Sequence, residues 1–483
     1  MEISWKPDKN SQVPLYKQII DFIKGEVSSG NWTVGTKLPA QRLLAQSFGV
    51  NRSTLIEALE ELKAEGIIEG KGGSSTRIAN NTWALLISNN KTNWEQYIEN
   101  GVHRPNLPTI QAINRLEFEP NIIRLGTGEL SPNLFPKEMM RNILTKMPDR
   151  INDLGYLEPK GLLDLRKVIC EYLKEFNINV SPKSVLIVSG ALQALQLISI
   201  GITPLGSTIL IENPSYIKSL HIFQSSGMKL VGLNMDKNGI MESEILNRIN
   251  KRNINFLYTI PTFHNPTGTL MPMDRRKNII NLCEKERMPI IEDDVYRELW
   301  IDNEPPMPLK SIDKNGNVLY LGSISKSLAP GFRIGWIVGP EPIIDRLADI
   351  KMQTDYGSSS ISQWAIVELI SSGHYFEHLQ ISRKNLKIRR DLVENLLNKY
   401  FKEIATWNIP KGGFYIWLEV KRNINMKRLF DEALKENLLI NPGYMYGHMN
   451  NKNIRISYSY AELEKLEKGL KKLAIIINHM ENF

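Results

Sequence analysis

The residues best suited to chemistry in this chain surround one lysine, Lys326, in the sequence SISKSLAPGFRIG at residues 323–335. An apolar run at residues 318–321 precedes it, and Arg333 follows a Pro-Gly turn. A buried lysine is a Schiff-base nucleophile in many sites, and pyridoxal phosphate (PLP) is its commonest aldehyde. Hydroxyls and an arginine nearby are what the phosphate of PLP would need. Most lysines that follow a strand are simply exposed, so this interpretation depends on residues elsewhere in the chain.

The elements that would position such a site are seven apolar runs, which predict buried strands. They lie at residues 185–188, 208–211, 230–233, 256–260, 289–291, 318–321 and 334–338. Helical segments alternate with these runs, which favours a mainly parallel α/β sheet. Ligands of such sheets bind at the carboxyl ends of the strands, so the residues directly after each run are the site candidates.

Four of these strand ends carry residues that suit a flat, phosphorylated ring. Gly190 leads into a helix whose free N–H groups suit a phosphate, and Tyr216 could stack on a heterocycle. The amide of Asn265 can donate to a phenolate oxygen, as can Tyr296. One carboxylate of the acidic stretch 292–294 would keep a pyridine nitrogen protonated. Core packing for the tyrosine and helix capping for an acid remain open alternatives.

The first eighty residues predict a winged helix-turn-helix. Helices are expected from Pro14, after Pro39 and over residues 52–64, with the turn Phe48-Gly49-Val50-Asn51 before the last, and residues 67–78 predict a hairpin. Such a module places the start of its third helix in the major groove of DNA. The candidate DNA contacts are Arg42, Arg52, Thr54, Lys71 and Gly72. A helix-turn-helix can also serve as a protein-interaction module.

Composition narrows the class of protein. The chain has 483 residues, 42% of them apolar and 23% charged, which is typical of globular proteins of more than one domain. No apolar run is long enough to cross a bilayer, and the first residues do not resemble a signal peptide. Two cysteines give no disulfide framework, so we expect a cytoplasmic protein. The net charge of +8 tolerates an anionic partner, and no metal site is expected.

Motifs in both halves resemble known families. The segments PLYxQI at residues 14–19, LPxxRxLA at 38–45 and GVxRxT at 49–54 resemble the GntR-type winged-helix motif. Residues 119–483 resemble a fold-type I PLP-dependent aminotransferase, with a large, mainly parallel sheet domain and a small α+β domain. This resemblance implies that Lys326 forms the internal aldimine. The other implied roles are the pyridine nitrogen for Asp293, the 3-oxygen for Asn265 and Tyr296, ring stacking for Tyr216, and the phosphate for Ala191, Leu192, Ser323 and Arg333.

The same resemblance implies two further contacts. Tyr156 would reach the phosphate of a neighbouring subunit, and Arg455 would grip a substrate or effector carboxylate. A GntR-type reader joined to an aminotransferase-like body resembles the MocR (GabR-like) subfamily of transcriptional regulators. That implies a head-to-tail homodimer that binds double-stranded DNA with repeated half-sites. The expected domains are 1–79 for DNA binding, 80–118 as a linker and 119–483 for PLP binding.

Three functions remain open at this point. The leading hypothesis is a PLP-dependent regulator that senses a small amino compound by external aldimine formation and changes its DNA binding. The second is a working aminotransferase with an appended DNA-binding domain. The third is a sensor of PLP itself.

Overall fold

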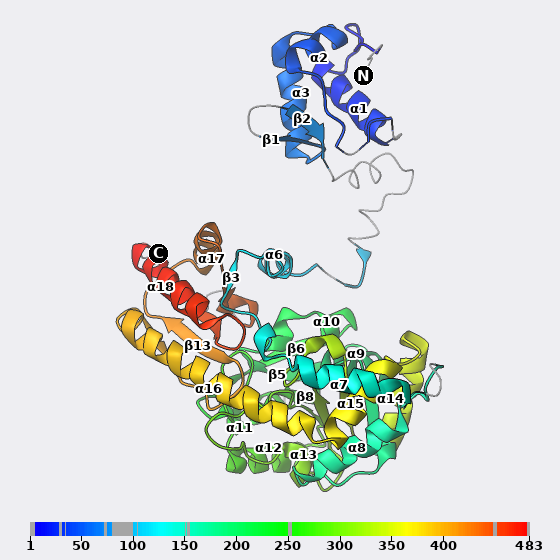
Figure 1. Ribbon diagram of the computed structural model, residues 1–483, viewed down its shortest axis with the longest axis vertical. Coiled ribbons are helices and arrows are strands. Elements are labelled where there is room, and N and C mark those ends of the chain that lie inside the picture. The colour runs from blue at the N-terminus through cyan, green and yellow to red at the C-terminus, as the bar shows by residue number, and fades with distance from the viewer. Residues whose placement is uncertain are drawn as a thin grey trace. The chain divides into compact units, whose positions relative to one another are not determined.

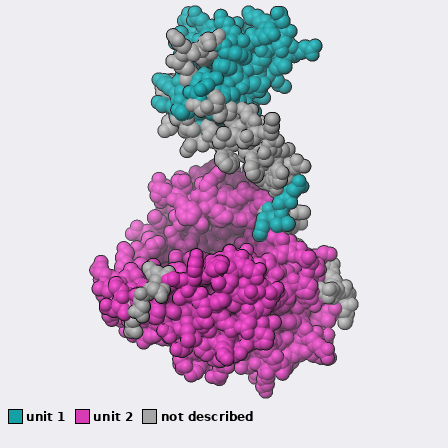
Figure 2. All heavy atoms as spheres, turned by 90° about the vertical axis from the view of Figure 1, so that its right-hand side faces the viewer, with its two compact units in different colours: residues 1–104 teal, residues 105–483 magenta. Residues whose placement is uncertain are grey.

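A computed structural model describes residues 5–28, 31–33, 35–71, 75–79, 100–103, 105–149, 151, 155–249, 254–447 and 452–480. The chain forms two compact units, residues 1–104 and 105–483, which Figure 2 shows in different colours. Each unit is described by itself below.

The smaller unit is a winged helix-turn-helix, as the sequence predicts. Its elements are α1 (Leu15–Ser28), α2 (Gln41–Phe48), α3 (Arg52–Ala64), β1 (Ile68–Lys71) and β2 (Ser75–Ile78). The strands pair antiparallel, with Ile68 opposite Ile78. One apolar cluster joins all five elements, and it includes Ile23, Leu44, Leu55 and Ile68.

The turn between α2 and α3 fixes the direction of the third helix. Gly49 has φ 68°, a left-handed conformation that glycine adopts without a Cβ clash. Asn51 then caps α3, since its side-chain oxygen accepts the Thr54 N–H at 2.8 Å. The glycine turn and the cap together set where α3 begins and leave its first residues exposed.

The larger unit is built on an eight-stranded sheet. In spatial order its strands are β4 (Val185–Val188), β11 (Gly335–Val338), β10 (Val318–Ser323), β9 (Ile290–Asp293), β8 (Ile254–Thr259), β5 (Thr208–Asn213), β6 (Lys229–Asp236) and β7 (Gly239–Ile240). The pairs from β10 across to β6 are parallel. β11 runs antiparallel to both of its neighbours, and β7 runs antiparallel to β6. The prediction of a mainly parallel sheet is confirmed, with these two strands as exceptions.

Helices cover both faces of this sheet (Figure 1). Leu186 and Val188 share one core with Leu195 of α9 (Ala191–Gly201) and Leu347 of α14 (Glu341–Thr354). Val185 and Ile187 point to the other face, where they pack with α8 (Leu163–Lys174) and α15 (Ser360–Ser371). Alternate residues of β4 thus pack into cores on opposite faces of the sheet, which is why all four residues of this strand are apolar. Further helices of this unit are α7 (Lys137–Lys146), α10 (Ile222–Ser225), α11 (Glu242–Ile249), α12 (Met273–Lys285) and α13 (Leu309–Ile312).

A smaller C-terminal part completes the unit. Its four-stranded sheet has the order β12 (Ala405–Trp407), β13 (Tyr415–Val420), β16 (Asn453–Ser457) and β15 (Asn441–Pro442). It carries α17 (Met426–Lys435) and α18 (Leu463–His479), and the long α16 (His374–Tyr400) packs along α18 (Figure 1). β14 (Leu438–Leu439) pairs in parallel with β3 (Ile123–Arg124), which ties this part to an early segment of the chain.

One helix lies inside the segment predicted as a linker. α6 (Pro108–Leu116) buries Ile110 and Ile113 in the main core of the larger unit. The compact unit accordingly begins at residue 105. This helix is hard to predict from the sequence because it is short and flanked by prolines. Its apolar residues, three positions apart, are the sign of a helix face.

Candidate functional site

A cavity of about 360 Å³ lies at the carboxyl ends of the parallel strands in the larger unit. Ten of the predicted cofactor and effector residues line it: Ala191, Leu192, Tyr216, Asn265, Asp293, Tyr296, Ser323, Lys326, Arg333 and Arg455. They come from seven separate stretches of the chain. Parallel strands bring their carboxyl ends to one edge, which explains why residues far apart in sequence meet here.

Lys326 lies on the connection between β10 and β11, and its side chain is half-buried. Its Nζ donates to the carbonyl of Gly128 at 2.7 Å. A Cβ at Gly128 would stand 2.1 Å from the Tyr415 hydroxyl and 3.8 Å from Lys326 Nζ. Only glycine leaves room at this point, so the segment from Gly126 to Gly128 forms a close wall beside the lysine.

Asp293 ends β9 and is 5% exposed. The Tyr258 hydroxyl donates to its Oδ2 at 2.8 Å, while its Oδ1 has no hydrogen-bond partner in the described part of the chain. Burial raises the pKa of this carboxyl from 3.8 to about 6, although the Tyr258 hydrogen bond opposes the rise. A buried carboxylate with one unsatisfied oxygen calls for a cationic donor in the cavity.

Asn265, Tyr296 and Tyr216 form one connected wall. The Asn265 Nδ2 donates to the Tyr296 hydroxyl at 3.2 Å, and the Tyr216 N–H donates to the Asn265 carbonyl at 3.1 Å. Burial raises the pKa of Tyr216 to about 12, and it also raises the pKa of Tyr296. Both phenols are therefore neutral near pH 7 and can donate a hydrogen bond.

The other wall suits an anion. Gly190, with φ 85°, is the N-cap of α9, and the first helix residues, Ala191 and Leu192, line the cavity. Arg333, itself left-handed at φ 53°, donates from Nη2 to the Ser189 carbonyl at 2.6 Å. A Cβ at Gly190 would stand 2.8 Å from that Nη2, so glycine lets the guanidinium reach the helix start.

The Ser323 hydroxyl already makes hydrogen bonds within the protein, which the sequence does not suggest. Its Oγ accepts the Ser325 N–H at 3.1 Å and lies 3.1 Å from the Ile334 carbonyl, to which it can donate. This hydroxyl therefore holds the turn that carries Lys326. Ser325, which was not predicted as a site residue, also lines the cavity and is a second hydroxyl candidate there.

Arg455 lies on β16, is 6% exposed and is fixed in place. Nη1 donates to Asn265 Oδ1 at 2.9 Å, and Nη2 donates to the Gly126 carbonyl at 2.7 Å. Its guanidinium carbon lies 4.2 Å from the centre of the Tyr415 ring and 4.9 Å from that of Tyr446. Its Nε has no partner among the described residues. An arginine held this firmly presents a ready site for a carboxylate.

Besides Ser325, four further residues that shape this site were not predicted from the sequence: Gly128, Tyr258, Tyr415 and Tyr446. Tyr258 sits within an apolar strand, where nothing local distinguishes a functional tyrosine from a core one. The tight sequence Gly126-Thr127-Gly128 was the one available signal for a close backbone approach.

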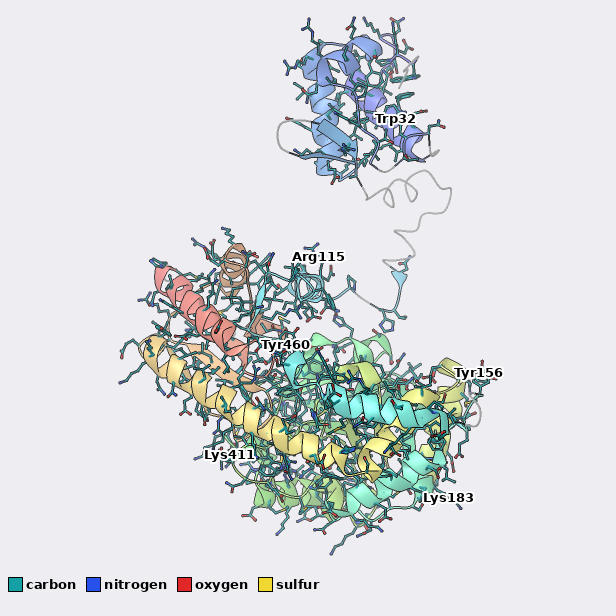
Figure 3. The ribbon with its side chains drawn as sticks, viewed as in Figure 1. Trp32, Arg115, Tyr156, Lys183, Lys411 and Tyr460 are labelled. Carbon is teal, nitrogen blue, oxygen red and sulfur yellow. The ribbon has the colours of Figure 1, made fainter. Side chains whose placement is uncertain are left out.

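Tyr156 is the one predicted cofactor residue outside the cavity. It is 85% exposed, and its ring centre lies 5.1 Å from that of Tyr356. Figure 3 shows it at the edge of the larger unit. Its predicted contact with a second subunit stays a prediction.

In the smaller unit, Arg42 and Arg52 are exposed near the starts of α2 and α3, and Thr54 is half-buried in the first turn of α3. Lys71 ends β1. The Lys71 side chain and Gly72 lie outside the described residues.

Two negative findings apply to the described residues alone. They contain no group of three or more His, Cys, Asp or Glu side chains placed to hold a metal ion. None of their helices combines the length and the apolar character needed to cross a membrane. Cys170 and Cys283 are both buried and free.

Comparison with known proteins gives two family matches. Residues 15–78 match the family described as bacterial regulatory proteins, gntR family. Residues 120–473 match the family described as aminotransferase class I and II, which spans more than half of the chain.

Relatives share both halves. The HTH-type transcriptional regulator YdfD of Bacillus subtilis is 51% identical over 472 residues, which cover 98% of each chain. The HTH-type transcriptional regulator NorG of Staphylococcus aureus (strain N315) is 39% identical over 444 residues, covering 90% of this chain and 98% of NorG.

Solved structures match the larger part. A kynurenine aminotransferase from Pyrococcus horikoshii, in complex with PMP, is 31% identical with a TM-score of 0.73, covering 78% of this chain and 95% of that one. LysN, an α-aminoadipate aminotransferase from Thermus thermophilus complexed with N-(5'-phosphopyridoxyl)-L-leucine, is 28% identical with a TM-score of 0.72, covering 80% and 98%. The chain therefore belongs to the MocR-like HTH-type transcriptional regulators, in which a GntR-family DNA-binding domain is joined to a class I and II aminotransferase domain.

Proposed function

We propose that this regulator binds PLP at Lys326 and senses a small amino compound by external aldimine formation. One observation carries the proposal: the half-buried amine of Lys326 shares a cavity with the buried carboxylate of Asp293, one oxygen of which has no partner in the described residues. PLP, when bound, supplies an aldehyde carbon at which one amine can replace another. It also supplies a ring nitrogen that a neighbouring carboxylate can keep protonated.

The residues around the cavity fit that cofactor. Asp293 would hold the proton on the ring nitrogen. The protonated nitrogen would donate to the free Oδ1 of Asp293 and lower the raised pKa of that carboxyl. Asn265 and Tyr296 would hold the 3-oxygen, and Tyr216 would stack on the ring. The phosphate would lie against Arg333, Ser323 and the first N–H groups of α9, at Ala191 and Leu192.

Arg455 would bind the carboxylate of the effector. Its two Nη groups are held by Asn265 and Gly126, and its Nε remains without a partner in the described part of the chain. Truncating it would remove the donor to Asn265 Oδ1, so Arg455 would both bind the effector and orient the Asn265 amide.

DNA binding follows from the GntR-family domain. Within it, Arg42, Arg52, Thr54, Lys71 and Gly72 would contact the operator. Two chains would form a head-to-tail homodimer, in which Tyr156 of the partner subunit completes the phosphate site and two DNA-binding domains read repeated half-sites. The exposure of Tyr156 supports a role outside its own chain.

A Lys326→Ala variant tests the proposal. We expect the variant to shift operator DNA in a gel with wild-type affinity and to lose any response to amino compounds. Borohydride reduction of the PLP-treated wild type should fix one phosphopyridoxyl group on Lys326, measured by peptide mass. A response that persists in the variant, or an unmodified Lys326, would contradict the mechanism.

A second candidate function is transamination, favoured because Lys326, Asp293 and Arg455 line one cavity. Incubation with amino acids and 2-oxo acids would show turnover as new amino acid products. The third possibility, a response to PLP alone, is tested by titrating operator binding with PLP and no amino compound.

A further inference from the structure

Two carboxylates that the proposed cofactor does not use line the same cavity as Lys326. Glu117 directly follows α6, and Glu129 directly follows Gly128. Neither side chain has a hydrogen bond or an ion pair within the part of the chain that the structure describes. Burial raises the pKa of Glu117, and the nearby charge of Glu129 raises it further.

Acidic side chains alone do not make a site, but this cavity has independent signs of a ligand. Asp293 and Arg455 are more than nine-tenths buried, and each brings an unpartnered polar atom to it, by the count of described residues. Unpaired charged atoms of this kind are costly unless a ligand completes them. The cavity is therefore built for a charged ligand that reaches several walls.

The charges of the cavity leave the two glutamates without a counterpart. Its charged side chains are Lys326, Arg333, Arg455, Asp293, Glu117 and Glu129. In the proposed function the first four serve the aldehyde, the phosphate, the carboxylate and the ring nitrogen. Nothing in that assignment offers a cation to Glu117 or Glu129.

Arg124 and Lys326, the two cationic side chains near Glu117, already have other partners. Arg124 offsets part of the rise in the pKa of Glu117, but its Nη1 donates to the Tyr460 hydroxyl at 2.9 Å and its guanidinium lies over that ring at 4.9 Å. Lys326 offsets this rise less, and its Nζ already donates to the Gly128 carbonyl at 2.7 Å. A cation from the ligand is what would then offset two neighbouring carboxylates.

Helix α6 contributes apolar side chains to the lining of the cavity. Ile110 and Ile113 on α6 line the cavity and are 8% and 7% exposed. Residues 110, 113 and 117 are three and four apart, so they lie on one face of the helix. That face offers two isoleucines and then a carboxylate, with Asn114 also in the lining, and this combination suits methylene groups that end in a cation.

Building on the proposed function, we infer that the effector is an amino acid whose side chain is a short methylene chain with a cationic end, as in a diamino acid. Its carboxylate pairs with Arg455, its α-amino group faces Lys326, and its distal cation pairs with Glu117 and Glu129. The two glutamates thus determine which amino compound the regulator accepts.

Calorimetric titration of the PLP-loaded, full-length protein tests this inference. The probes are L-ornithine, L-norvaline, which has the same chain without the distal amine, and L-glutamate. We expect ornithine to bind at least about tenfold more tightly than norvaline, as a charged hydrogen bond predicts, and glutamate to bind more weakly than both. In a Glu117→Gln, Glu129→Gln double variant, ornithine should fall to the affinity of norvaline, while norvaline itself changes little.

Glu119→Gln is the matched control, because Glu119 is exposed on the same segment and does not line the cavity. It should keep the preference for ornithine. Equal binding of ornithine and norvaline to the wild type, or a preference that survives in the double variant, overturns the inference. If borohydride traps PLP on Lys326 but none of the three amino acids binds, this inference fails while the cofactor assignment stands. If no adduct forms at Lys326, the proposed function fails, and the inference fails with it.

Discussion

The buried carboxylate of Asp293 gives a quantitative test of the site through an Asp293→Asn change, which keeps the shape and removes the charge. Asp293 is 5% exposed, its Oδ2 accepts a hydrogen bond from Tyr258, and its Oδ1 has no partner within the described ranges. Burial raises its pKa from 3.8 to about 6. In the cofactor-free protein the charge on Asp293 therefore lowers the free energy of unfolding, and the variant lacks this charge.

The size of that cost follows from the pKa. Each unit of pKa is worth about 1.36 kcal/mol, so ionising Asp293 in the folded protein costs about 3 kcal/mol. Because the folded pKa is the higher one, the associated stability is fully present below pH 3.8 and is lost as the pH rises through 6. About 2 kcal/mol of the loss falls between pH 4.5 and 7. The new amide can leave an N–H unsatisfied at about 1–3 kcal/mol, but this cost does not depend on pH.

Urea unfolding of the cofactor-free protein at pH 4.5 and at pH 7 measures the effect, with tryptophan fluorescence as the probe. The difference in unfolding free energy between variant and wild type should move by about 2 kcal/mol in favour of the variant at pH 7. Asp274→Asn, which removes an exposed carboxylate from the same unit, controls for the loss of one charge.

Adding PLP should reverse the order at pH 7. The wild type gains the free energy of ligand binding, and the variant, which lacks the anion for the ring nitrogen, gains much less. A difference that does not change with pH would refute the burial argument. A variant that retains PLP as tightly as the wild type would refute the assignment of Asp293 to the ring nitrogen.

Two further predictions concern close packing and helix capping. Gly128→Ala should destabilise the larger unit by about 1–3 kcal/mol and weaken PLP retention, because the new Cβ would meet Tyr415; thermal unfolding should show no such loss for Gly331→Ala, which faces open space. Asn51→Ala removes the cap on the Thr54 N–H and should cost the DNA-binding unit about 1 kcal/mol, together with some operator affinity, in thermal unfolding and gel-shift assays. Unchanged unfolding of either variant would show that the contact contributes nothing.

The sheet and most of the cavity could be predicted because continuous apolar runs identify buried strands. Seven predicted runs correspond to β4, β5, β6, β8, β9, β10 and β11, with ends within a few residues. Residues directly after those runs, such as Asn265 and Asp293, then meet at one edge. The reversed direction of β11 could not be predicted, because direction depends on which strands pair, and an apolar run does not contain that information.

Contacts between side chains on neighbouring strands could not be predicted from the sequence either. Tyr258 pairs in register with Ile291, so Asp293, two residues further along β9, lies on the same face of the sheet. Only this register brings the tyrosine to the carboxylate. α6 and Glu117 were missed for a related reason, since their place against the cavity depends on tertiary packing of a short helix between prolines.

The site draws on two sheets, and under the proposed function this arrangement would let an effector act on the spacing between them. Asp293 ends β9 and Lys326 follows β10 of the eight-stranded sheet, whereas Arg455 lies on β16 of the four-stranded sheet. An effector that carries both an amine and a carboxylate must contact both sheets at once. A ligand shifts a conformational equilibrium only by as much as it binds one state better than the other. If the proposed function holds, we expect a compound with an amine but no carboxylate to contact the first sheet alone and to leave the spacing between the two sheets unchanged.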